Sequence, residues 1–196
     1  IVVPEPALIW HMDMTQMRIY KGRKQYIFGV VDACTRQVHY MMNYSKKTLE
    51  KIKALGSYEK ARREINTLKE LSHFFVETEK HHKREEDALF PRLEAHGITE
   101  PPQIFKEDHV EFLAKKKEFF NTMMSEGIGF SELVNVIEPI IDFLTKNLDE
   151  HIYKEDNILY PMALESLSKD EWKDVRKKFD AIGYCCFAPA DLKKKR

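Results

Sequence analysis

The sequence is poor in the residues that interrupt or cross-link a chain. Its 196 residues include 7 Gly, 8 Pro and 3 Cys. So few glycines and prolines exclude a collagen-like repeat and argue against long disordered segments. The cysteines are Cys34 and the neighbouring pair Cys185 and Cys186, which cannot form an even disulfide framework. We therefore expect reduced thiols.

Two further absences restrict the partners. The chain has no apolar run of about 18 residues, and residues 1–10 lack the basic flank and long apolar stretch of a secretory signal. Lys plus Arg equals Asp plus Glu at 32 each, so net charge provides no general attraction to nucleic acid or to an anionic membrane. We expect a cytoplasmic protein that binds neither, and any partner has to be inferred from specific sites.

Helical periodicity dominates the remainder of the chain. Apolar residues make up 43% of the sequence and charged residues 33%, which is typical of a soluble helical protein. Apolar spacing and capping residues predict four long helices and a short C-terminal one, over about 32–55, 58–95, 101–126, 131–160 and 169–180. The second is long for one straight helix, so we expect a short helix over about 58–65 that continues, with or without a break, into the rest. The fold class predicted is all-α, an up-down four-helix bundle.

The first 31 residues have a different character. Residues 17–20 and 25–31 are β-prone runs on either side of a Lys-Gly-Arg-Lys turn sequence. We expect an N-terminal arm or hairpin over 1–31, the bundle over 32–183 and a C-terminal tail over 184–196.

An internal repeat carries the chemistry. Residues 81–91 align without gaps on residues 151–161, at an offset of 70 residues, and the same offset places His109 on His39. Each half contains a histidine, a His-x-x-x-Glu block 42 residues later, and a proline six residues after that glutamate. This period is typical of a duplicated helical hairpin that pairs into a bundle with approximate two-fold symmetry.

The repeat predicts a dinuclear metal site. Residues four apart lie on one face of a helix, so each His-x-x-x-Glu block can hold one ion. The predicted ligands are His39, His81, Glu85, His109, His151 and Glu155. Buried carboxylates and imidazoles would be strongly destabilising without a cation. Nitrogen and carboxylate ligands suit iron or manganese better than a structural zinc site. We expect two iron ions, oxo- or hydroxo-bridged, rather than manganese or zinc.

Neighbouring polar residues are interpreted differently. His82 follows His81, but its repeat partner is Ile152, so we expect it to pack in the core or lie at the surface. Glu86 and Asp156 fall about 100° off the ligand face and would serve only if their helices were rotated.

The motifs resemble the hemerythrin-type cation-binding family. Residues 85–98 and 156–162 are similar to its bacterial and archaeal branch, often found beside sensory PAS domains, and the resemblance covers roughly residues 32–183. It implies a helical bundle around a non-haem di-iron centre. Oxygen-carrying members have a second histidine four residues after the helix-three ligand, where this chain has Leu113. The remaining ligand set is similar to those of iron-centre repair proteins and of eukaryotic iron-sensing hemerythrin domains.

These observations leave two functions open. Open coordination positions favour a sensor or binding module for O2, NO or iron availability. The alternative is a di-iron enzyme or iron-donating protein that reduces NO or peroxide or repairs iron centres, although no separate acid or base residue identifies a reaction. A purely structural metal is disfavoured because a chain of this length can build a core without one.

Overall fold

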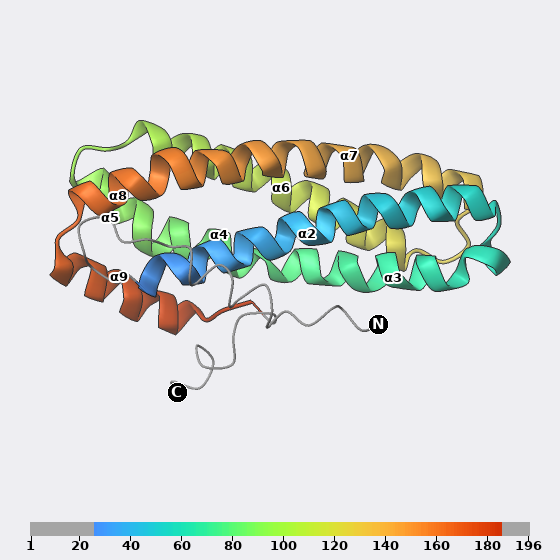
Figure 1. Cartoon of the computed structure of the whole chain (residues 1–196), viewed down its shortest axis with the longest axis horizontal. Coiled ribbons are helices and arrows are strands. Elements are labelled where there is room, and N and C mark those ends of the chain that lie inside the picture. Colours follow the sequence, from blue (N-terminus) through green and yellow to red (C-terminus); the bar gives the residue numbers. More distant parts are fainter. Residues whose placement is uncertain (1–25, 186–196) are drawn as a thin grey trace.

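The structure is a computed structural model that describes residues 26–185, with side chains from Val38 onward. All elements within this range are helical (Figure 1). They are α2 (Tyr26–Leu55), α3 (Tyr58–Glu77), α4 (Glu79–Arg84), η1 (Glu85–Leu89), α5 (Phe90–Ala95), α6 (Glu100–Met124), α7 (Phe130–Lys154), η2 (Glu155–Leu159), α8 (Tyr160–Ser166) and α9 (Lys169–Ile182). η1 and η2 are single π-helical turns.

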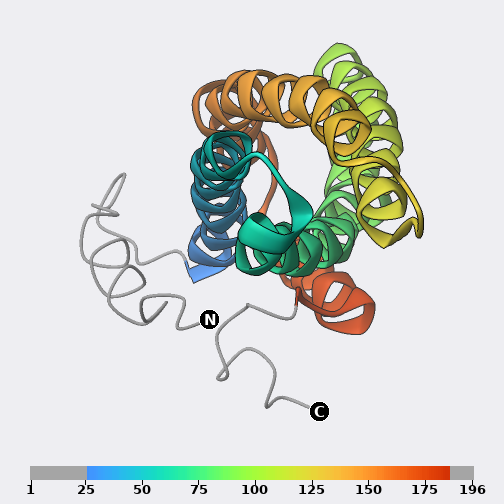
Figure 2. The ribbon, with the colours of Figure 1, turned by 90° about the vertical axis from the view of Figure 1, so that its right-hand side faces the viewer.

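These elements form an up-down four-helix bundle, which confirms the predicted fold class. Its second member consists of α3, α4, η1 and α5, and its fourth consists of α7, η2 and α8. Successive members run antiparallel along the long axis (Figure 1). Both α2 and α6 pack against α3 and α7, so the four members close into the ring seen end-on in Figure 2. α9 lies outside this ring and packs on α4 and η1.

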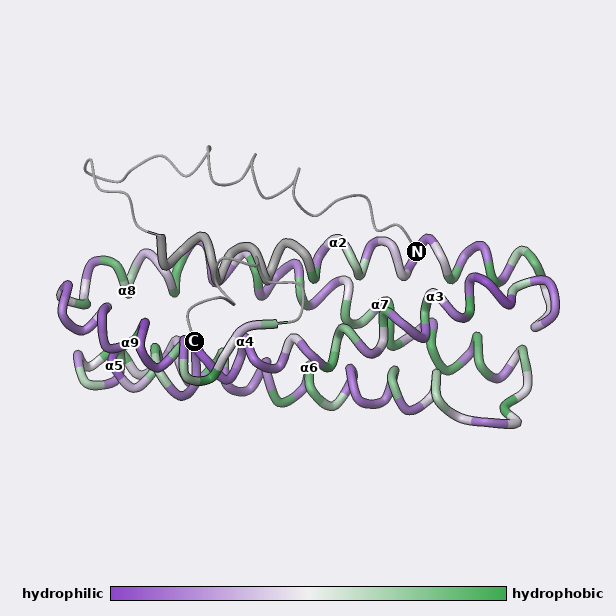
Figure 3. Tube along the Cα trace, turned by 90° about the horizontal axis from the view of Figure 1, so that it is seen from below, coloured by the Kyte–Doolittle hydropathy of each residue, from purple (hydrophilic) through white to green (hydrophobic). Residues whose placement is uncertain are grey.

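Two apolar clusters stabilise the bundle. Apolar and polar residues alternate along each helix (Figure 3), so each helix has a face that can be buried. The first cluster includes Met42, Leu49, Ile52, Leu68, Phe75, Phe119, Ile137, Ile141 and Leu144. The second includes Leu89, Phe90, Leu93, Phe105, Leu159, Ala163, Val175 and Phe179. Burial of each large side chain contributes about 1.5–3 kcal/mol, so both clusters contribute strongly to the stability of the bundle.

The polar residues of interest lie between these clusters. On α6, His109 lies between Phe105 of the second cluster and Phe112 of the first. On α7, His151 follows Leu148, the last residue of that helix in the first cluster. The interior therefore changes from apolar to polar and back to apolar along the axis.

The start of the first helix differs from the prediction. Residues 26–31 belong to α2, so the expectation of a strand there is wrong, and the helix begins six residues earlier than expected. Strand propensity is a weak local preference, whereas each residue added to an existing helix gains a backbone hydrogen bond. Residues 17–20, the other predicted β-prone run, lie outside the described residues.

The second bundle member is interrupted at Thr78. α3 is continuous from Tyr58 to Glu77, so the helix does not break near residue 65, a point that the prediction had left open. The Thr78 backbone N–H and hydroxyl both donate to the Phe75 carbonyl, which tightens the turn. The break therefore lies one residue before α4, the helix that carries His81.

The C-terminal helix has the predicted capping box. Ser168 Oγ accepts from the Glu171 backbone N–H at 3.3 Å, and Glu171 Oε2 accepts from the Ser168 backbone N–H at 2.8 Å. Gly183 ends α9 with φ = +88°, a left-handed value that favours glycine. Among the described helices, none combines the length and apolar character that crossing a membrane requires.

Candidate metal centre

A π-helical turn begins at each glutamate of the repeat. After each turn a backbone N–H donates to the carbonyl five residues back, from Phe90 to Glu85 and from Tyr160 to Glu155. The next residue is a proline in both cases. A proline lacks an N–H and clashes with the preceding turn, which accounts for the local widening. The duplication seen in the sequence is therefore reproduced in the backbone.

His81 lies between the two glutamates. Its Nε2 is 3.2 Å from Glu155 Oε1 and 3.5 Å from Glu85 Oε2. None of the three side chains is more than 4% exposed. One ligand atom from each lies within 4.8 Å of the others, which is close enough to surround an ion.

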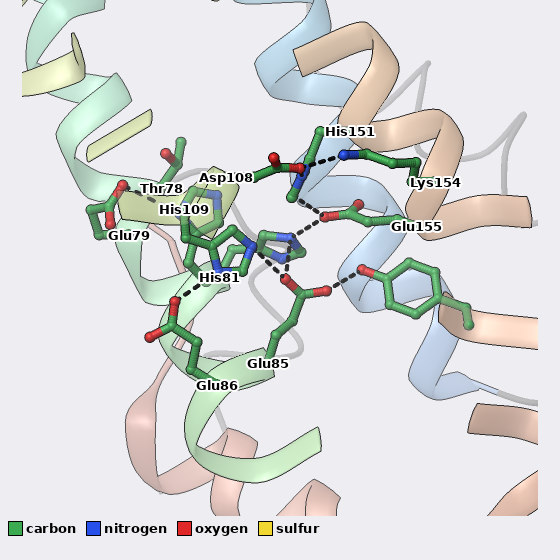
Figure 4. Close-up of polar contacts among 12 residues, drawn as sticks. Thr78, Glu79, His81, Glu85, Glu86, Asp108, His109, His151, Lys154 and Glu155 are labelled. Carbon is green, nitrogen blue, oxygen red and sulfur yellow. Dashed lines mark hydrogen bonds and ion pairs between the residues drawn. The ribbon is translucent and has the colours of Figure 1, made fainter. Parts of the chain in front are cut away.

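Two further histidines contact the same two carboxylates. His109 Nε2, from α6, is 3.4 Å from Glu85 Oε2, and His151 Nε2, from α7, is 3.1 Å from Glu155 Oε1 (Figure 4). Each glutamate thus lies between two imidazoles. Three of the four bundle members contribute to this arrangement.

Outer carboxylates orient these two imidazoles. His109 Nδ1 lies 2.7 Å from Glu86 Oε1, and His151 Nδ1 lies 2.9 Å from Asp108 Oδ2 (Figure 4). Lys154 Nζ donates to the same Asp108 oxygen at 2.5 Å. When Nδ1 donates outward, Nε2 keeps its lone pair toward the interior, as in carboxylate–histidine–metal arrangements. Glu86, which does not lie on the predicted ligand face, therefore orients the predicted ligand His109.

Tyr160 makes the two halves unequal. Its hydroxyl donates to Glu85 Oε1 at 2.7 Å, whereas its repeat partner is Phe90, which has no donor. Burial and the nearby charges of Glu155 and Glu85 raise the pKa of Tyr160 well above its usual value, so the hydroxyl remains a donor. Sequence analysis missed this residue, although the Phe-to-Tyr difference in the repeat was visible.

Without a cation, protons balance the charge of the carboxylates. Burial opposes protonation of His151, but hydrogen bonds to Asp108 and Glu155 outweigh it and raise its pKa to about 9. Burial alone would raise the pKa of Glu155, yet the charge of His81 and the hydrogen bonds from both histidines hold it far below its usual range. The His109 pKa is also raised, because carboxylate hydrogen bonds outweigh its burial. The centre is thus a cluster of anions stabilised by positive charge.

The donor set fits a metal. Within the described residues, four buried atoms at the middle of the site make no well-aligned hydrogen bond: Glu85 Oε2, Glu155 Oε2, and His109 Nε2 and His151 Nε2, which lie 3.4 and 3.1 Å from carboxylate oxygens. A buried polar atom left unsatisfied costs about 1–3 kcal/mol, and more when charged. All four are lone-pair donors that a divalent cation would satisfy at once.

The structure brings together five of the six predicted ligands and leaves His39 apart. The His39 side chain is 49% exposed, with Nδ1 2.5 Å from Asp149 Oδ1 and Nε2 3.0 Å from Asn43 Nδ2. On α2, Val38 and Met42 face the interior, and one residue along a helix turns the side chain by about 100°. The spacing predicted the level of His39 along the bundle, and in the structure its side chain lies on the solvent side of α2.

His82 was expected to pack in the core or lie at the surface, and the structure has it packed. It is buried beside the centre, with its ring stacked on that of His109 at a centroid distance of 4.0 Å. Burial, and next the charge of Lys116, lower its pKa well below the usual value, so it is a neutral imidazole. Its position next to His81 was the sequence signal that His82 could lie near the centre. The repeat argued against this, because the repeat partner of His82 is Ile152.

Comparison with known proteins agrees with this geometry. Residues 37–167 match the hemerythrin HHE cation-binding domain. A comparison with curated proteins found no significant match. The matched segment contains the repeat, both π-helical turns and the buried histidines and glutamates. Because the match spans more than half of the sequence and the donor set suits a cation, the chain belongs to the hemerythrin HHE cation-binding family.

Proposed function

We propose that this chain holds two iron ions in the middle of the bundle and acts as a sensor or binding module for O2, NO or iron. The observation that carries the proposal is the buried group of His81, Glu85, His109, His151 and Glu155, whose potential metal-ligand atoms lie close together and in part lack a well-aligned hydrogen bond. Family membership supports cation binding. The resemblance to di-iron members supports the identity and number of the ions.

Ligand chemistry favours iron over zinc. The two groups of potential ligands in the described part of the chain contain imidazole and carboxylate and no thiolate. Structural zinc sites use four ligands, commonly with cysteine, whereas mixed nitrogen and oxygen sites with bridging carboxylates suit iron. Bound iron would supply redox chemistry and positions for a diatomic ligand.

The chain's own residues would hold and tune this centre. Glu86 and Asp108 orient the imidazoles of His109 and His151, and Tyr160 restrains one oxygen of Glu85. Phe105 and Phe112 lie against the His151 ring, at centroid distances of 4.9 and 5.0 Å, and keep water from that side. Ligand exchange would therefore alter contacts on three bundle members at once, which is how a sensor transmits a change.

Metal analysis of anaerobically purified protein tests the proposal. We expect two iron ions per chain, with Mössbauer and absorption spectra of a coupled pair that change on addition of O2 or NO. Stoichiometric zinc without iron, or no bound metal, would contradict it. Reaction that stops after one equivalent of ligand supports sensing, whereas sustained turnover would replace the sensor with an enzyme.

A further inference from the structure

α9 lies along a stripe of four residues on the outside of the second bundle member. This first stripe consists of Arg84, Ala88, Arg92 and His96, spaced four residues apart. Three polar contacts join it to α9: His96 Nε2 to Glu171 Oε1 at 2.8 Å, Arg92 Nη2 to Asp174 Oδ2 at 3.4 Å, and Arg84 Nη1 to the Gly183 carbonyl at 2.8 Å. α9 therefore runs antiparallel to this member, with its C-terminal end beside Arg84.

Apolar packing completes the contact between α9 and the first stripe. Ala88 of η1 is fully buried, in the same apolar cluster as Val175 and Phe179 of α9. Arg84 is 1% exposed, with its guanidinium carbon 5.7 Å from the centre of the Phe179 ring. Val175 and Phe179 are four residues apart and so share one face of α9. The first stripe thus binds an amphipathic helix through two apolar side chains and a cation at the helix C-terminus.

The 70-residue repeat places an equivalent stripe on the fourth bundle member. This second stripe consists of Lys154, Ile158, Met162 and Ser166. A π-helical turn falls at the same place in both stripes, so the side chains of the second also share one face. Among the elements that the structure describes, α9 packs on η1, whereas η2 packs mainly on α7 and α8, the helices that it joins. α9 itself lies on the opposite side of the bundle from α7 (Figures 1 and 2).

The second stripe is exposed where the first is buried. Ile158 is 43% exposed, whereas its repeat partner Ala88 is fully buried. The Lys154 side chain is 32% exposed, whereas Arg84 is buried. The second stripe also has larger apolar side chains, because isoleucine replaces Ala88 and Met162 replaces an arginine. Covering these side chains with apolar surface would be favourable, so the second stripe offers more to an apolar partner than the first.

The charge at one end of the stripe is retained. Lys154 replaces Arg84, and its Nζ donates to Asp108 Oδ2 at 2.5 Å. An ammonium group has three donors, so it can also bind a carbonyl. The carbonyls at the C-terminus of a helix carry partial negative charge and therefore complement a lysine at this position. A helix in the orientation of α9 would place its C-terminal end there.

We propose that the second stripe is a docking site for an amphipathic helix of a partner protein. The helix runs antiparallel to the fourth bundle member and places two large apolar side chains, four residues apart, on Ile158 and Met162. Its C-terminal carbonyls lie beside Lys154. The site is on the outer surface and goes beyond the proposed function, because it does not depend on what the interior binds.

A peptide with the sequence of α9 tests this proposal, because it has the chemistry that the stripe should recognise. The peptide spans residues 168–184 and carries a fluorophore at its N-terminus. A hydrocarbon staple replaces the exposed Lys173 and Lys177, since an isolated helix of this length is only marginally stable. Fluorescence anisotropy measures its binding to the full chain.

Variants of the chain and of the peptide show which contacts carry the binding. We expect wild type to bind the peptide, and Ile158→Glu and Met162→Glu to bind it about tenfold or more weakly, because each puts a charge into an apolar contact. Tyr153→Glu is the matched control, since Tyr153 is 66% exposed and lies off the stripe, and it should bind as wild type does. A peptide carrying Phe179→Glu should not bind. Circular dichroism and thermal melting check the fold of each variant.

Hydrogen exchange locates the bound peptide. Protection across residues 154–166 supports the proposal, whereas protection confined to 84–96, where the peptide would displace α9, overturns it. Equal affinity of wild type and both stripe variants, or no binding up to about 1 mM peptide, also overturns it. Concentration-dependent dimerisation of wild type that Ile158→Glu abolishes would overturn it as well, by assigning the stripe to a second copy of this chain.

Discussion

As a proposed metal ligand, His151 should make metal affinity depend on pH. Its pKa of about 9 exceeds the unfolded value near 6.5, so at neutral pH the metal-free protein carries a proton there that a metal has to displace. The affinity should therefore rise by up to about tenfold per pH unit from pH 7 and level off near pH 9. Competition titrations with a chelator of known affinity measure this slope.

Asp108→Asn provides the matched comparison. The variant loses one of the hydrogen bonds that raise the His151 pKa, so the pH at which affinity levels off should fall below 9. Metal affinity that does not vary between pH 6 and 9 in wild type would show that metal binding displaces no proton from His151.

Tyr160 provides a second prediction at the residue scale. Tyr160→Phe removes the donor to Glu85 Oε1 and leaves a buried carboxylate oxygen without that hydrogen bond, which should destabilise the metal-free protein by about 1–3 kcal/mol. Tyr184→Phe is the control, because its hydroxyl donates to the exposed carboxylate of Asp180, where water can replace it. Urea unfolding measures both changes. Equal losses in the two variants would contradict a special role for the buried contact.

At the scale of the element, capping rather than burial determines where α9 begins. Ser168→Ala removes the acceptor for the Glu171 backbone N–H and should destabilise this helix by about 1 kcal/mol, seen as faster hydrogen exchange across Lys169–Ile182. Ser57→Ala is the matched control. Its hydroxyl accepts at 3.5 Å from a lysine backbone N–H and has no reciprocal glutamate, so its effect should be smaller. No change in exchange over α9 would show that packing alone defines this helix.

The boundaries of the helices show which features could be predicted from the sequence. The predicted helix around residues 169–180 was located correctly because a capping box is local and its residues act on their own backbone. The break at Thr78 was not predicted, because it involves Lys116, which is 38 residues away in the chain and contacts Thr78 only after α6 has packed. The π-helical turns were not predicted, although the prolines that follow them were part of the repeat.

At the scale of the whole molecule, the two apolar clusters should keep the bundle folded without metal. Removal of metal by a chelator should leave the helical circular dichroism intact but lower Tm. A ligand present at a thousand times its Kd stabilises by about 4 kcal/mol per site, which corresponds to roughly 10 °C for a chain of this size. Complete unfolding on chelation would show that the metal, rather than the clusters, holds the bundle together. An unchanged Tm would show that the protein binds no metal tightly.

The helical class, the duplication and the residues of the two His-x-x-x-Glu blocks could be predicted from the sequence, because periodicity and capping act over a few residues and a repeat is visible without a structure. Which histidines face the interior became clear only in the folded bundle. His39 and His82 each lie one residue from a buried neighbour, and the direction of such a side chain depends on how its helix is rotated against the others. That rotation is determined by packing and by contacts such as Lys116 with Thr78, which join distant segments. For this reason the spacing identified the level of the metal centre, and the packing of the bundle selected its inward-facing histidines.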